Sequence, residues 1–455
     1  MATRIIVLAA GKGTRMKSAM PKVLHTLAGK SLLLHALDTV ASLTPAGITV
    51  VIGHEAEQVR RSVTDRSDLA LHWAVQEQQL GTGHAVLQGL DGIADDDDVL
   101  ITYGDVPLTR ASTYQALLNV CSDQSIGLLT LLMDDPTGYG RIIRDGGAIV
   151  GVVEQKDATD DQLTISEVNA GVVAIKGGSL RSLLARVDNN NAQGEYYLTD
   201  IHKLAVKEGL RITAVHPEDV WETDGVNSRS QLARLERIHQ QNLAEQLMAN
   251  GVSLADPARI DIRGSLQTGT DVSIDVNCVF EGNCSVGSNV SIGQNCLISG
   301  SHIADNSVIL ANCVLENAAV GENVTVGPFA RLRPGTELGS NVRIGNFVET
   351  KNAQIGHASK VNHLSYVGDS VVGTNVNVGA GTITCNYDGA NKHRTTIEDD
   401  VFIGSNSALV APLTIGAGAT VGAGSTIGRN VPANRLSIAR GKQIDLEHWT
   451  RPVKK

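Results

Sequence analysis

The chain has 455 residues, which is too long for one ordinary hydrophobic core, so two or more domains are expected. Asp and Glu number 48 against 38 Lys and Arg, and the net charge of −10 argues against a dedicated nucleic-acid-binding protein. The N-terminal residues run directly into a strand pattern without a secretory signal, and no apolar run approaches the roughly 20 residues of a membrane span. We therefore expect a cytoplasmic protein that binds neither nucleic acid nor membranes.

Residues 1–226 alternate short β-branched runs with helical stretches. The runs RIIVLAAG, GITVVIGH, DVLITYGD and SIGLLTLLMDD read as strands of one sheet, with helices between them. This alternation predicts an α/β domain in the first half of the chain.

The first strand opens into a glycine-containing, basic turn, GKGTRM, which is followed by Pro21 and Lys22. Gly11 and Gly13 let the backbone approach a phosphate or a base closely, while Arg15 and Lys22 bring two cations to the same turn. The segment lacks the third glycine of a dinucleotide-binding fingerprint and the GK[ST] of a P-loop, so neither of those motifs is present.

Asp105 stands at the end of the strand VLITYGD, where an α/β sheet usually presents its ligands. A carboxylate there could hold Mg²⁺, which prefers one or two protein oxygens together with substrate phosphates. It could equally cap a turn before Pro107, and the residues alone leave both interpretations open. The acidic run 95–98 lies in a predicted turn, and we expect it to be solvated surface.

Residues 227–250 carry apolar side chains at helical spacing and are predicted to form a linker helix. Gly251 supplies a stop, because glycine readily adopts the left-handed conformation that ends many helices. The charged face with Arg234, Glu236 and Arg237 is predicted to be solvated.

Residues 251–455 follow a different rule, in which an aliphatic residue recurs every six positions. The expected inward positions are Ile274, Phe280, Val286, Ile292, Ile298, Val308, Val314, Val320, Val326, Leu332, Leu338 and Ile344, and then Ile397, Ile403, Leu409, Ile415, Val421 and Ile427. A short fixed period is the signature of a solenoid, in which each repeat stacks on its neighbours. Three hexapeptides would make one triangular coil with an aliphatic side chain inward on each face.

The corners and the small inward positions of this solenoid can also be assigned. Asparagine stands three residues after several aliphatic positions, where a corner favours a residue that tolerates positive φ, at Asn289, Asn323, Asn341 and Asn375. Small cysteines precede the aliphatic position by two residues, at Cys278, Cys284 and Cys296. A disulfide between Cys278 and Cys296 is geometrically conceivable, but in a reducing cytosol we expect free thiols.

The six-residue register breaks between Asn377 and Ile397, where the insertion AGTITCNYDGANKHRTT is expected to leave the solenoid as a loop. The preceding repeats carry a polar cluster, Arg333, Lys351, His363 and Tyr366. Two cations suit a sugar phosphate, and a histidine suits proton removal from an amine. His357 and His393 are further candidates, so the residues alone do not choose the base.

Motifs along nearly the whole chain are similar to those of one family. LAAGKGTRM with the following PK resembles the signature of sugar-1-phosphate nucleotidyltransferases, and EQQLGTGHA, YGDVPL, PTGYGRI, VEQKDAT, NAGV, NNNAQGEYYLTD and GVN follow in order. The repeats resemble left-handed parallel β-helix acyltransferases, with NVGAGTITCNYDGANKH intact. Together they resemble the bacterial bifunctional N-acetylglucosamine-1-phosphate uridylyltransferase and glucosamine-1-phosphate N-acetyltransferase family.

The resemblance implies a Rossmann-like, GT-A type nucleotidyltransferase domain, a left-handed parallel β-helix and a homotrimer. It implies transfer of UMP from UTP to N-acetylglucosamine 1-phosphate with release of pyrophosphate. Asp105 and Asn227 would hold Mg²⁺, and Arg15 and Lys22 would neutralise charge. The implied nucleotide and sugar contacts are Leu8, Ala9, Ala10, Gly11, Lys22, Gln76, Gly81, Thr82, Tyr103, Gly104, Asp105, Gly140, Glu154, Asn169 and Asn227.

For the second activity, the resemblance implies acetylation of glucosamine 1-phosphate by acetyl-coenzyme A, with His363 as the general base. Arg333, Lys351, Tyr366 and Asn377 would hold the sugar phosphate, and Ala380, Asn386, Tyr387, Ser405, Ala423 and Arg440 would line the coenzyme cleft. The alternative is a monofunctional sugar-1-phosphate nucleotidyltransferase whose β-helix serves only assembly or regulation. His363 with the NYDGAN loop favours the bifunctional interpretation, because a spacer needs neither.

Overall fold

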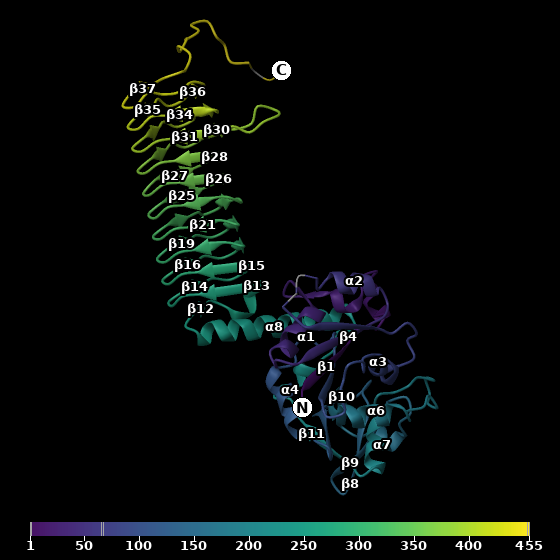
Figure 1. The fold of residues 1–455 in the computed structure, drawn as a ribbon. Coiled ribbons are helices and arrows are strands. Elements are labelled where there is room, and N and C mark those ends of the chain that lie inside the picture. Colours follow the sequence, from purple (N-terminus) through teal and green to yellow (C-terminus); the bar gives the residue numbers. More distant parts are fainter. Residues whose placement is uncertain (1, 65, 67, 453, 455) are drawn as a thin grey trace. The chain divides into compact units, whose positions relative to one another are not determined.

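The computed structural model describes residues 2–64, 66, 68–452 and 454. It divides into two compact units, one ending at His239 and the other beginning at Gln240 (Figure 1). Among the described helices, none combines the length and the apolar composition that crossing a bilayer requires.

The first unit is built on a mixed sheet in the order β11-β7-β10-β6-β1-β4-β5, with β8 and β9 attached through β10. Its strands are β1 (Thr3–Leu8), β4 (Gly47–Ile52), β5 (Leu71–Val75), β6 (Asp98–Tyr103), β7 (Ser125–Leu132), β8 (Arg141–Asp145), β9 (Ala148–Val153), β10 (Glu167–Lys176) and β11 (Arg211–Val215), and a separate hairpin joins β2 (Thr26–Leu27) to β3 (Lys30–Ser31). The four predicted strand runs correspond to β1, β4, β6 and β7. The α/β prediction is confirmed.

Helices cover both faces of this sheet, because successive residues of its central strands are apolar and point to opposite faces. Ile6 and Leu8 of β1 belong to a core with α3, α6 and α7, whereas Ile5 and Val7 belong to a core with α1, α2 and α4. The helices of the unit are α1 (Leu32–Ala41), α2 (Ala56–Arg61), α3 (Thr82–Gln88), α4 (Ala111–Val120), α5 (Asp160–Leu163), α6 (Gly177–Leu184) and α7 (Asp200–Lys207), with 3₁₀ turns η1 (Thr14–Met16), η2 (Lys22–Leu24) and η3 (Val220–Thr223). Burial on both faces explains the nearly continuous apolar runs of the central strands.

Strands β1, β4, β5 and β6 are parallel, so their carboxyl ends meet at one edge of the sheet. At this edge the backbone amide of Ala9 donates to Val51 (2.8 Å), and that of Gly104 donates to Leu8 (2.9 Å). The loops after β1 and β6 are therefore held side by side, at the place where parallel sheets bind ligands.

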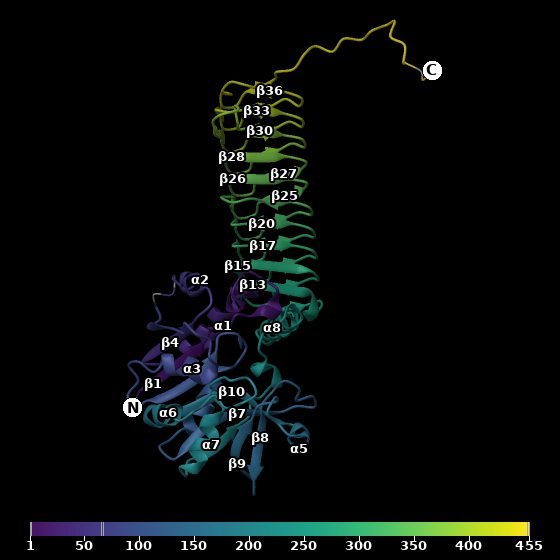
Figure 2. The same cartoon turned by 90° about the vertical axis from the view of Figure 1, so that its right-hand side faces the viewer.

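The second unit is a parallel β-helix of stacked coils (Figure 2). One face contains β12 (Ser253–Leu254), β14 (Ser273–Ile274), β16 (Ser291–Ile292), β19 (Val308–Ile309), β22 (Thr325–Val326), β25 (Arg343–Asn346), β27 (Lys360–His363), β29 (Asn377–Val378), β32 (Phe402–Ile403), β35 (Thr420–Val421) and β37 (Leu436–Ser437). The other faces share a sheet of β13 (Ile260–Thr268), β15 (Cys278–Val286), β17 (Leu297–Ser299), β18 (His302–Ile303), β20 (Val314–Glu316), β21 (Ala319–Val320), β23 (Arg331–Leu332), β24 (Glu337–Leu338), β26 (Glu349–Ile355), β28 (Tyr366–Val372), β30 (Ile383–Cys385), β31 (Thr395–Ile397), β33 (Ala408–Val410), β34 (Leu413–Ile415) and β36 (Thr426–Ile427). All pairings between these coils are parallel, which confirms the predicted fold class.

The coil length varies, and this corrects two of the expected inward positions. Ile274 pairs with Ile292 one coil later, 18 residues away, whereas Ile292 pairs with Ile309, 17 residues away. A side shortened by one residue moves the register, so Ile309 and Leu315 are buried and their neighbours Val308 and Val314 are only half-buried. Aliphatic spacing alone could not locate this deletion, because both members of each pair are aliphatic.

The loop that leaves the β-helix is shorter than predicted. Ile383–Cys385 stays in the coil as β30, which pairs with β28 and β33. The extra residues enter only after it, and they lengthen the step between paired residues to 25, from Val378 to Ile403. The loop that leaves the coil therefore begins at Asn386, rather than at Ala380.

The corner asparagines and the small inward cysteines agree with the prediction. All four corner asparagines have φ between 56° and 63°. Cys278, Cys284 and Cys296 are buried, and every cysteine of the chain is a free thiol. The solenoid thus accepts small polar or sulfur-containing side chains in its interior at fixed positions.

The predicted linker helix is α8 (Arg229–Ala249), and the boundary between the two units falls inside it. Leu235 packs in a small core of the first unit, whereas Leu247 packs in the core of the second. Glu236 corrects the expectation of a wholly solvated charged face, because its carboxylate accepts a hydrogen bond from the Ala28 amide at 2.7 Å. Gly251 follows the helix with φ 92°, as expected for a stop.

Within the second unit, Gln240 caps the open edge of the first long strand, β13. Its buried side chain accepts from the Ile262 amide (2.7 Å) and donates to the Ile262 carbonyl (2.8 Å), as a further strand would. These backbone groups point away from β15, so without Gln240 they would be buried without partners, and an unmet buried hydrogen bond costs about 1–3 kcal/mol.

We predict that Gln240→Met lowers the local opening free energy of β13 by about 1–3 kcal/mol, seen as faster hydrogen exchange of the peptide 260–268 by mass spectrometry of the full chain. Gln241→Met is the matched control, because Gln241 makes only an exposed contact with Glu245. Equal exchange in both variants would contradict the capping role.

Candidate active sites

The first candidate site is a cavity of about 360 Å³ at the carboxyl edge of the sheet. Its lining includes ten of the sequence-predicted contacts, Leu8, Ala9, Ala10, Gly11, Lys22, Gln76, Gly81, Thr82, Tyr103 and Asp105. Val23, Gln79, Ala85 and Glu195 also line it, and the sequence analysis did not identify them. Gln79 could have been found, because it stands in the EQQLGTGHA motif and its amide donates to the Ala10 carbonyl at 2.5 Å.

Gly81 gives this cavity its shape. It has φ 111°, and a Cβ there would lie 2.6 Å from the Tyr196 carbonyl oxygen, so only glycine fits. The carbonyl of Gly81 accepts from the buried amide of Gln76 at 3.1 Å, which fixes the orientation of that side chain. The fixed amide leaves a defined edge toward the cavity, as recognition of a base requires.

Lys22, Asp105 and Asn227 meet at one point. The Lys22 ammonium forms a short ion pair with Asp105 Oδ2 and donates to Asn227 Oδ1 at 2.9 Å. The amide of Val226 donates to the Asp105 carbonyl at 2.9 Å, so the segment before Asn227 is joined to the end of β6. Residues far apart in sequence therefore converge on one cation.

These two oxygens suit Mg²⁺, a hard cation that prefers oxygen ligands and completes its shell with water and phosphate. The donor set therefore fits a metal bound together with a substrate phosphate. In the described residues no group of three or more His, Cys, Asp or Glu side chains could hold a metal ion. A site of one carboxylate and one amide leaves most of the coordination to the substrate.

In the acidic run 95–98, Asp95 and Asp96 are exposed in a turn as expected, whereas Asp97 and Asp98 have structural partners, which corrects the expectation for these two. Asp97 is buried and accepts from the amides of Ala2 and Ala94 at 3.1 and 3.0 Å. Asp98 pairs with Lys176 at 2.7 Å. These carboxylates tie the start of β6 in place, at the end of the strand opposite Asp105.

Three predicted sugar contacts also converge. The backbone amide of Asn169 donates to the Gly140 carbonyl at 2.9 Å. A Cβ on Gly140 would lie 3.5 Å from Glu154 Oε2. Glu154 accepts from Thr199 at 3.0 Å, and burial raises the pKa of its carboxyl above the ordinary value. The Glu154 carboxyl group accepts a hydrogen bond from one hydroxyl, and it can accept others from the hydroxyls of a ligand.

Tyr103, at the end of β6, lies near both Glu154 and Asp105, whose charges act on its phenol. Burial raises the pKa of its phenol well above the ordinary range, and Gly171 has no Cβ that would strike its ring. Gly104 is similarly crowded, with a would-be Cβ 3.0 Å from Leu33. Arg15, by contrast, is exposed in η1 and does not belong to the described lining of the cavity.

The second candidate site follows one corner of the β-helix. Asn346 and His363 are partners on adjacent coils, and the His363 carbonyl accepts from the Gly381 amide at 3.3 Å. Ala380 accepts from Asn406 (2.7 Å), and Ser405 accepts from Gly424 (2.8 Å), so the corner continues upward through Ala423. Ser405 follows Ala380 by 25 residues and Ala423 follows Ser405 by 18, as the coils pair there.

Arg440 reaches the top of this corner, where its guanidinium donates to the Ala423 carbonyl at 2.8 Å. Four of the predicted coenzyme contacts, Ala380, Ser405, Ala423 and Arg440, therefore lie along one line above His363. A long ligand can follow such a line, with its reacting end at the histidine. Asn377 begins β29, on the face that leads into the corner.

The hydrogen bond of His363 decides which ring nitrogen is free. Nδ1 lies 2.8 Å from Asn346 Oδ1, which can only accept, so Nδ1 is the donor and Nε2 is the nitrogen that has a free lone pair in the neutral imidazole. His393 instead pairs with Asp388 at 2.7 Å inside the loop, and His357 lies 3.5 Å from Asn341 on another corner. The geometry thus favours His363 as a base.

A cationic group lies on the adjoining face. The ammonium of Lys392 nearby, together with burial, lowers the pKa of Lys351 below its ordinary value, and Arg333 contributes in the same direction. Arg333 pairs with Glu349 at 2.9 Å. Clustered like charges of this kind favour a bound phosphate, which relieves their repulsion. Lys392 was not among the predicted contacts, although the NYDGANKH motif contains it.

Asp369 connects this group to the loop. Burial alone would raise the pKa of its carboxyl, but hydrogen bonds from Asn352 and Asn386 and the nearby lysines lower it below the ordinary value. Asn386 also lies 3.4 Å from the Tyr366 hydroxyl, whereas Tyr387 is exposed on the loop. Among the described residues, no hydrogen bond joins His363 to Arg333, Lys351 or Tyr366.

Family models match both halves of the chain. A MobA-like NTP transferase domain matches residues 5–135, a GMPPB C-terminal domain matches 262–343, and a bacterial transferase hexapeptide of six repeats matches 394–429. Among solved structures, a nucleotidyl transferase from Methanothermobacter thermautotrophicus aligns with 52% of this chain and 96% of its own chain. The identity is 18% and the TM-score is 0.38.

Curated relatives match over almost the full length. The proteins named bifunctional protein GlmU from Cupriavidus pinatubonensis and Herminiimonas arsenicoxydans are 55% and 51% identical, each covering 99% of both chains. That of Ralstonia nicotianae is 55% identical over 99% of this chain and 98% of its own. The chain therefore belongs to the bifunctional GlmU family, the uridylyltransferase and N-acetyltransferase of UDP-N-acetylglucosamine biosynthesis that its motifs resemble.

Proposed function

We propose that the two activities of this family lie on separate units of the chain, with uridylyl transfer at the cavity of the first and acetyl transfer at the His363 corner of the second. The convergence of Lys22, Asp105 and Asn227 supports the first assignment. The line of family contacts above His363 supports the second. On this division, residues 1–226 form the first domain, 227–250 the linker helix and 251–455 the second domain.

In the first site, an oxygen of N-acetylglucosamine 1-phosphate attacks the α-phosphorus of UTP, and pyrophosphate leaves. The attacking oxygen is already an anion, so the protein needs no general base and instead positions the reactants and neutralises charge. Gln76 and the backbone of residues 8–11 orient the uridine. Lys22, which already bridges two oxygen atoms, is placed to neutralise the developing phosphate charge, and Arg15 in the η1 turn would add a second cation.

Asp105 and Asn227 would hold Mg²⁺, which supplies charge neutralisation at the phosphates when bound. Glu154, Asn169 and the backbone of Gly140 hold the sugar hydroxyls. Because Lys22 shares both oxygens, metal binding requires its ammonium to turn toward the substrate phosphates.

In the second site, His363 Nε2 takes the proton from the glucosamine amine as its nitrogen attacks the thioester carbonyl of acetyl-coenzyme A. The C–S bond then breaks, and coenzyme A leaves as the thiol with the proton that His363 returns. Asn346 holds the imidazole in the tautomer that can accept this proton. The sugar phosphate is held by Arg333, Lys351, Tyr366 and Asn377. The coenzyme is held by the line of Ala380, Ser405, Ala423 and Arg440 together with the loop residues Asn386 and Tyr387. A spacer or regulatory β-helix would need no such column, so the monofunctional alternative is disfavoured.

An exposed apolar stripe beside His363 supports a homotrimer. Phe329, Phe347 and Leu364 are between 51% and 63% exposed at one corner of successive coils, and the two phenylalanine rings stack 5.4 Å apart. Contiguous apolar surface of this kind marks an interface. A second copy seated there would lie against the residue that follows His363, so each acetylation site would be completed between neighbouring subunits.

Asp105→Ala is predicted to abolish uridylyl transfer and to leave acetyl transfer at the parent rate, because the metal ligand serves only phosphate chemistry. Both rates can be measured on the same preparation, with UTP and Mg²⁺ in one assay and acetyl-coenzyme A in the other. Normal uridylyl transfer would refute the metal assignment, and a matching loss of both activities would refute the division between units.

His363→Ala is predicted to slow acetyl transfer roughly 10²- to 10⁴-fold, with coenzyme binding and uridylyl transfer unchanged. Raising the pH should partly restore the rate, since more of the glucosamine amine is then already deprotonated. The pH profile of acetylation checks this. A variant with the parent rate near pH 7 would place the base elsewhere, and His393→Ala is the matched comparison.

The trimer is tested by light scattering of the full chain at micromolar concentration. The parent should have three times the mass of one chain, and Phe347→Asp should reduce both the mass and acetyl transfer while sparing uridylyl transfer. A monomeric parent that still acetylates would contradict the proposal.

A further inference from the structure

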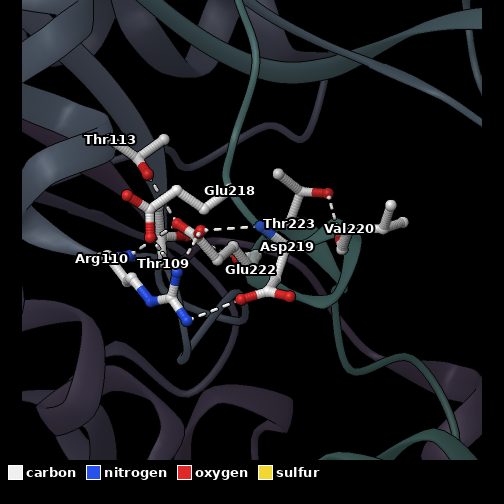
Figure 3. Close-up of polar contacts among 8 residues, drawn as sticks. All are labelled: Thr109, Arg110, Thr113, Glu218, Asp219, Val220, Glu222 and Thr223. Carbon is white, nitrogen blue, oxygen red and sulfur yellow. Dashed lines mark hydrogen bonds and ion pairs between the residues drawn. The ribbon is translucent and has the colours of Figure 1, made fainter.

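A buried carboxylate outside the cavity connects the two segments that carry Asp105 and Asn227 (Figure 3). Glu222, in η3, has a fully buried side chain. Arg110, at the start of α4, follows Asp105 by five positions, and Glu222 precedes Asn227 by five positions. Each proposed metal ligand is therefore one short segment away from this contact.

Donors from both segments surround the Glu222 carboxylate. Oε2 accepts from the Thr113 hydroxyl at 2.6 Å and from the Arg110 amide at 3.1 Å. Oε1 accepts from the Asp219 amide at 3.2 Å and lies 3.4 Å from the Arg110 guanidinium. The carboxylate is thus shared between the first turn of α4 and its own 3₁₀ turn, and its burial is compensated on both sides.

Further contacts hold the same two segments together. The Thr109 hydroxyl donates to the Glu222 carbonyl at 2.8 Å. Arg110 also pairs with Glu218 and Asp219, each at 2.6 Å, and its guanidinium lies 4.9 Å from the centre of the Trp221 ring. Figure 3 shows Thr109, Arg110, Glu218 and Asp219 gathered around Glu222 at the turn of η3. This attachment is rigid, because nearly every group in it is bonded to a second member.

The segments 105–110 and 222–227 are joined to each other at both ends. From Glu222 the chain runs through Asp224 to Asn227, and from Arg110 it runs back to Asp105. The Val226 amide joins the two segments again through the Asp105 carbonyl, next to the ligands. The two segments are therefore joined twice, by the Val226–Asp105 hydrogen bond next to the ligands and by the Glu222 contacts with Thr109 and Arg110.

We infer that Glu222, together with Arg110 and Thr113, is a positioning group that sets the distance between the two Mg²⁺ ligands of uridylyl transfer. This inference rests on the proposed metal site. Glu222 is not part of the described lining of the cavity, and it acts through the segments that carry Asp105 and Asn227. Its carboxylate form matters because two acceptor oxygens serve four donors, and an amide would turn a donor toward the Arg110 amide.

The test compares Glu222→Gln, Thr113→Val and Asp97→Asn in the full chain. Asp97→Asn is the matched control, because Asp97 is also a buried carboxylate bonded to two backbone amides, but at the opposite end of β6. Mn²⁺ affinity is measured by electron paramagnetic resonance with UDP-N-acetylglucosamine present. Uridylyl kcat and KM for UTP, acetyl transfer and the unfolding temperature are measured in parallel.

Glu222→Gln should bind Mn²⁺ about 10- to 100-fold more weakly and lower the uridylyl kcat, with partial recovery at higher Mg²⁺, while KM for UTP and acetyl transfer stay near parent values. Thr113→Val removes one donor and should shift Mn²⁺ affinity in the same direction by less. It carries the test if Glu222→Gln does not fold. Asp97→Asn should lose stability without a change in Mn²⁺ affinity.

Unchanged Mn²⁺ affinity in the folded Glu222 and Thr113 variants, or an equal loss in Asp97→Asn, would overturn the inference. The variant Asp105→Asn distinguishes a failure of the positioning role of Glu222 from a failure of the proposed metal site. If Asp105→Asn binds Mn²⁺ as the parent does, the metal site itself is wrong. If Asp105→Asn loses Mn²⁺ while Glu222→Gln keeps it, the metal site stands and only the positioning role is wrong.

Discussion

Parallel strand pairing is the constraint on which both sites depend. In the first unit it brings the carboxyl ends of β1 and β6 to one edge, so that the Gly11 loop and Asp105 border the same cavity. In the second unit it stacks each residue above its counterpart one coil earlier, so that Asn346, His363 and Ala380 share a corner. Pairing of this kind converts a distance along the sequence into a contact in space.

The two sites use charge differently. In the first, one lysine is shared between Asp105 and Asn227, and on the proposed function this places a cation beside the substrate phosphates. In the second, Lys392 and Arg333 lie close enough to Lys351 to lower its pKa. The negative charge of the buried Asp369 offsets this effect only in part. An incoming sugar phosphate would relieve that repulsion, which makes the ligand itself part of the electrostatic balance.

Buried carboxylates organise the first unit outside its cavity. Asp97 holds the start of β6, and Glu222 joins the segments beyond its end. Each is surrounded by backbone amides or hydroxyls, so its charge is stabilised locally. Strand β6 is consequently fixed at both ends, and Asp105 extends from a rigid element rather than from a free loop.

The sequence by itself determined the α/β first half, the hexapeptide solenoid, the corner asparagines and, through motif similarity, most of the cavity lining. These features repeat locally or stand in contiguous motifs, so spacing and residue type are enough to predict them. Only the tertiary structure decided the rest. The inward choice of Ile309 over Val308 depends on a one-residue deletion between two equally apolar neighbours. Contacts such as Lys22 with Asn227, and Arg110 with Glu222, join residues more than 100 positions apart, and nothing in local periodicity records which distant donor meets which acceptor.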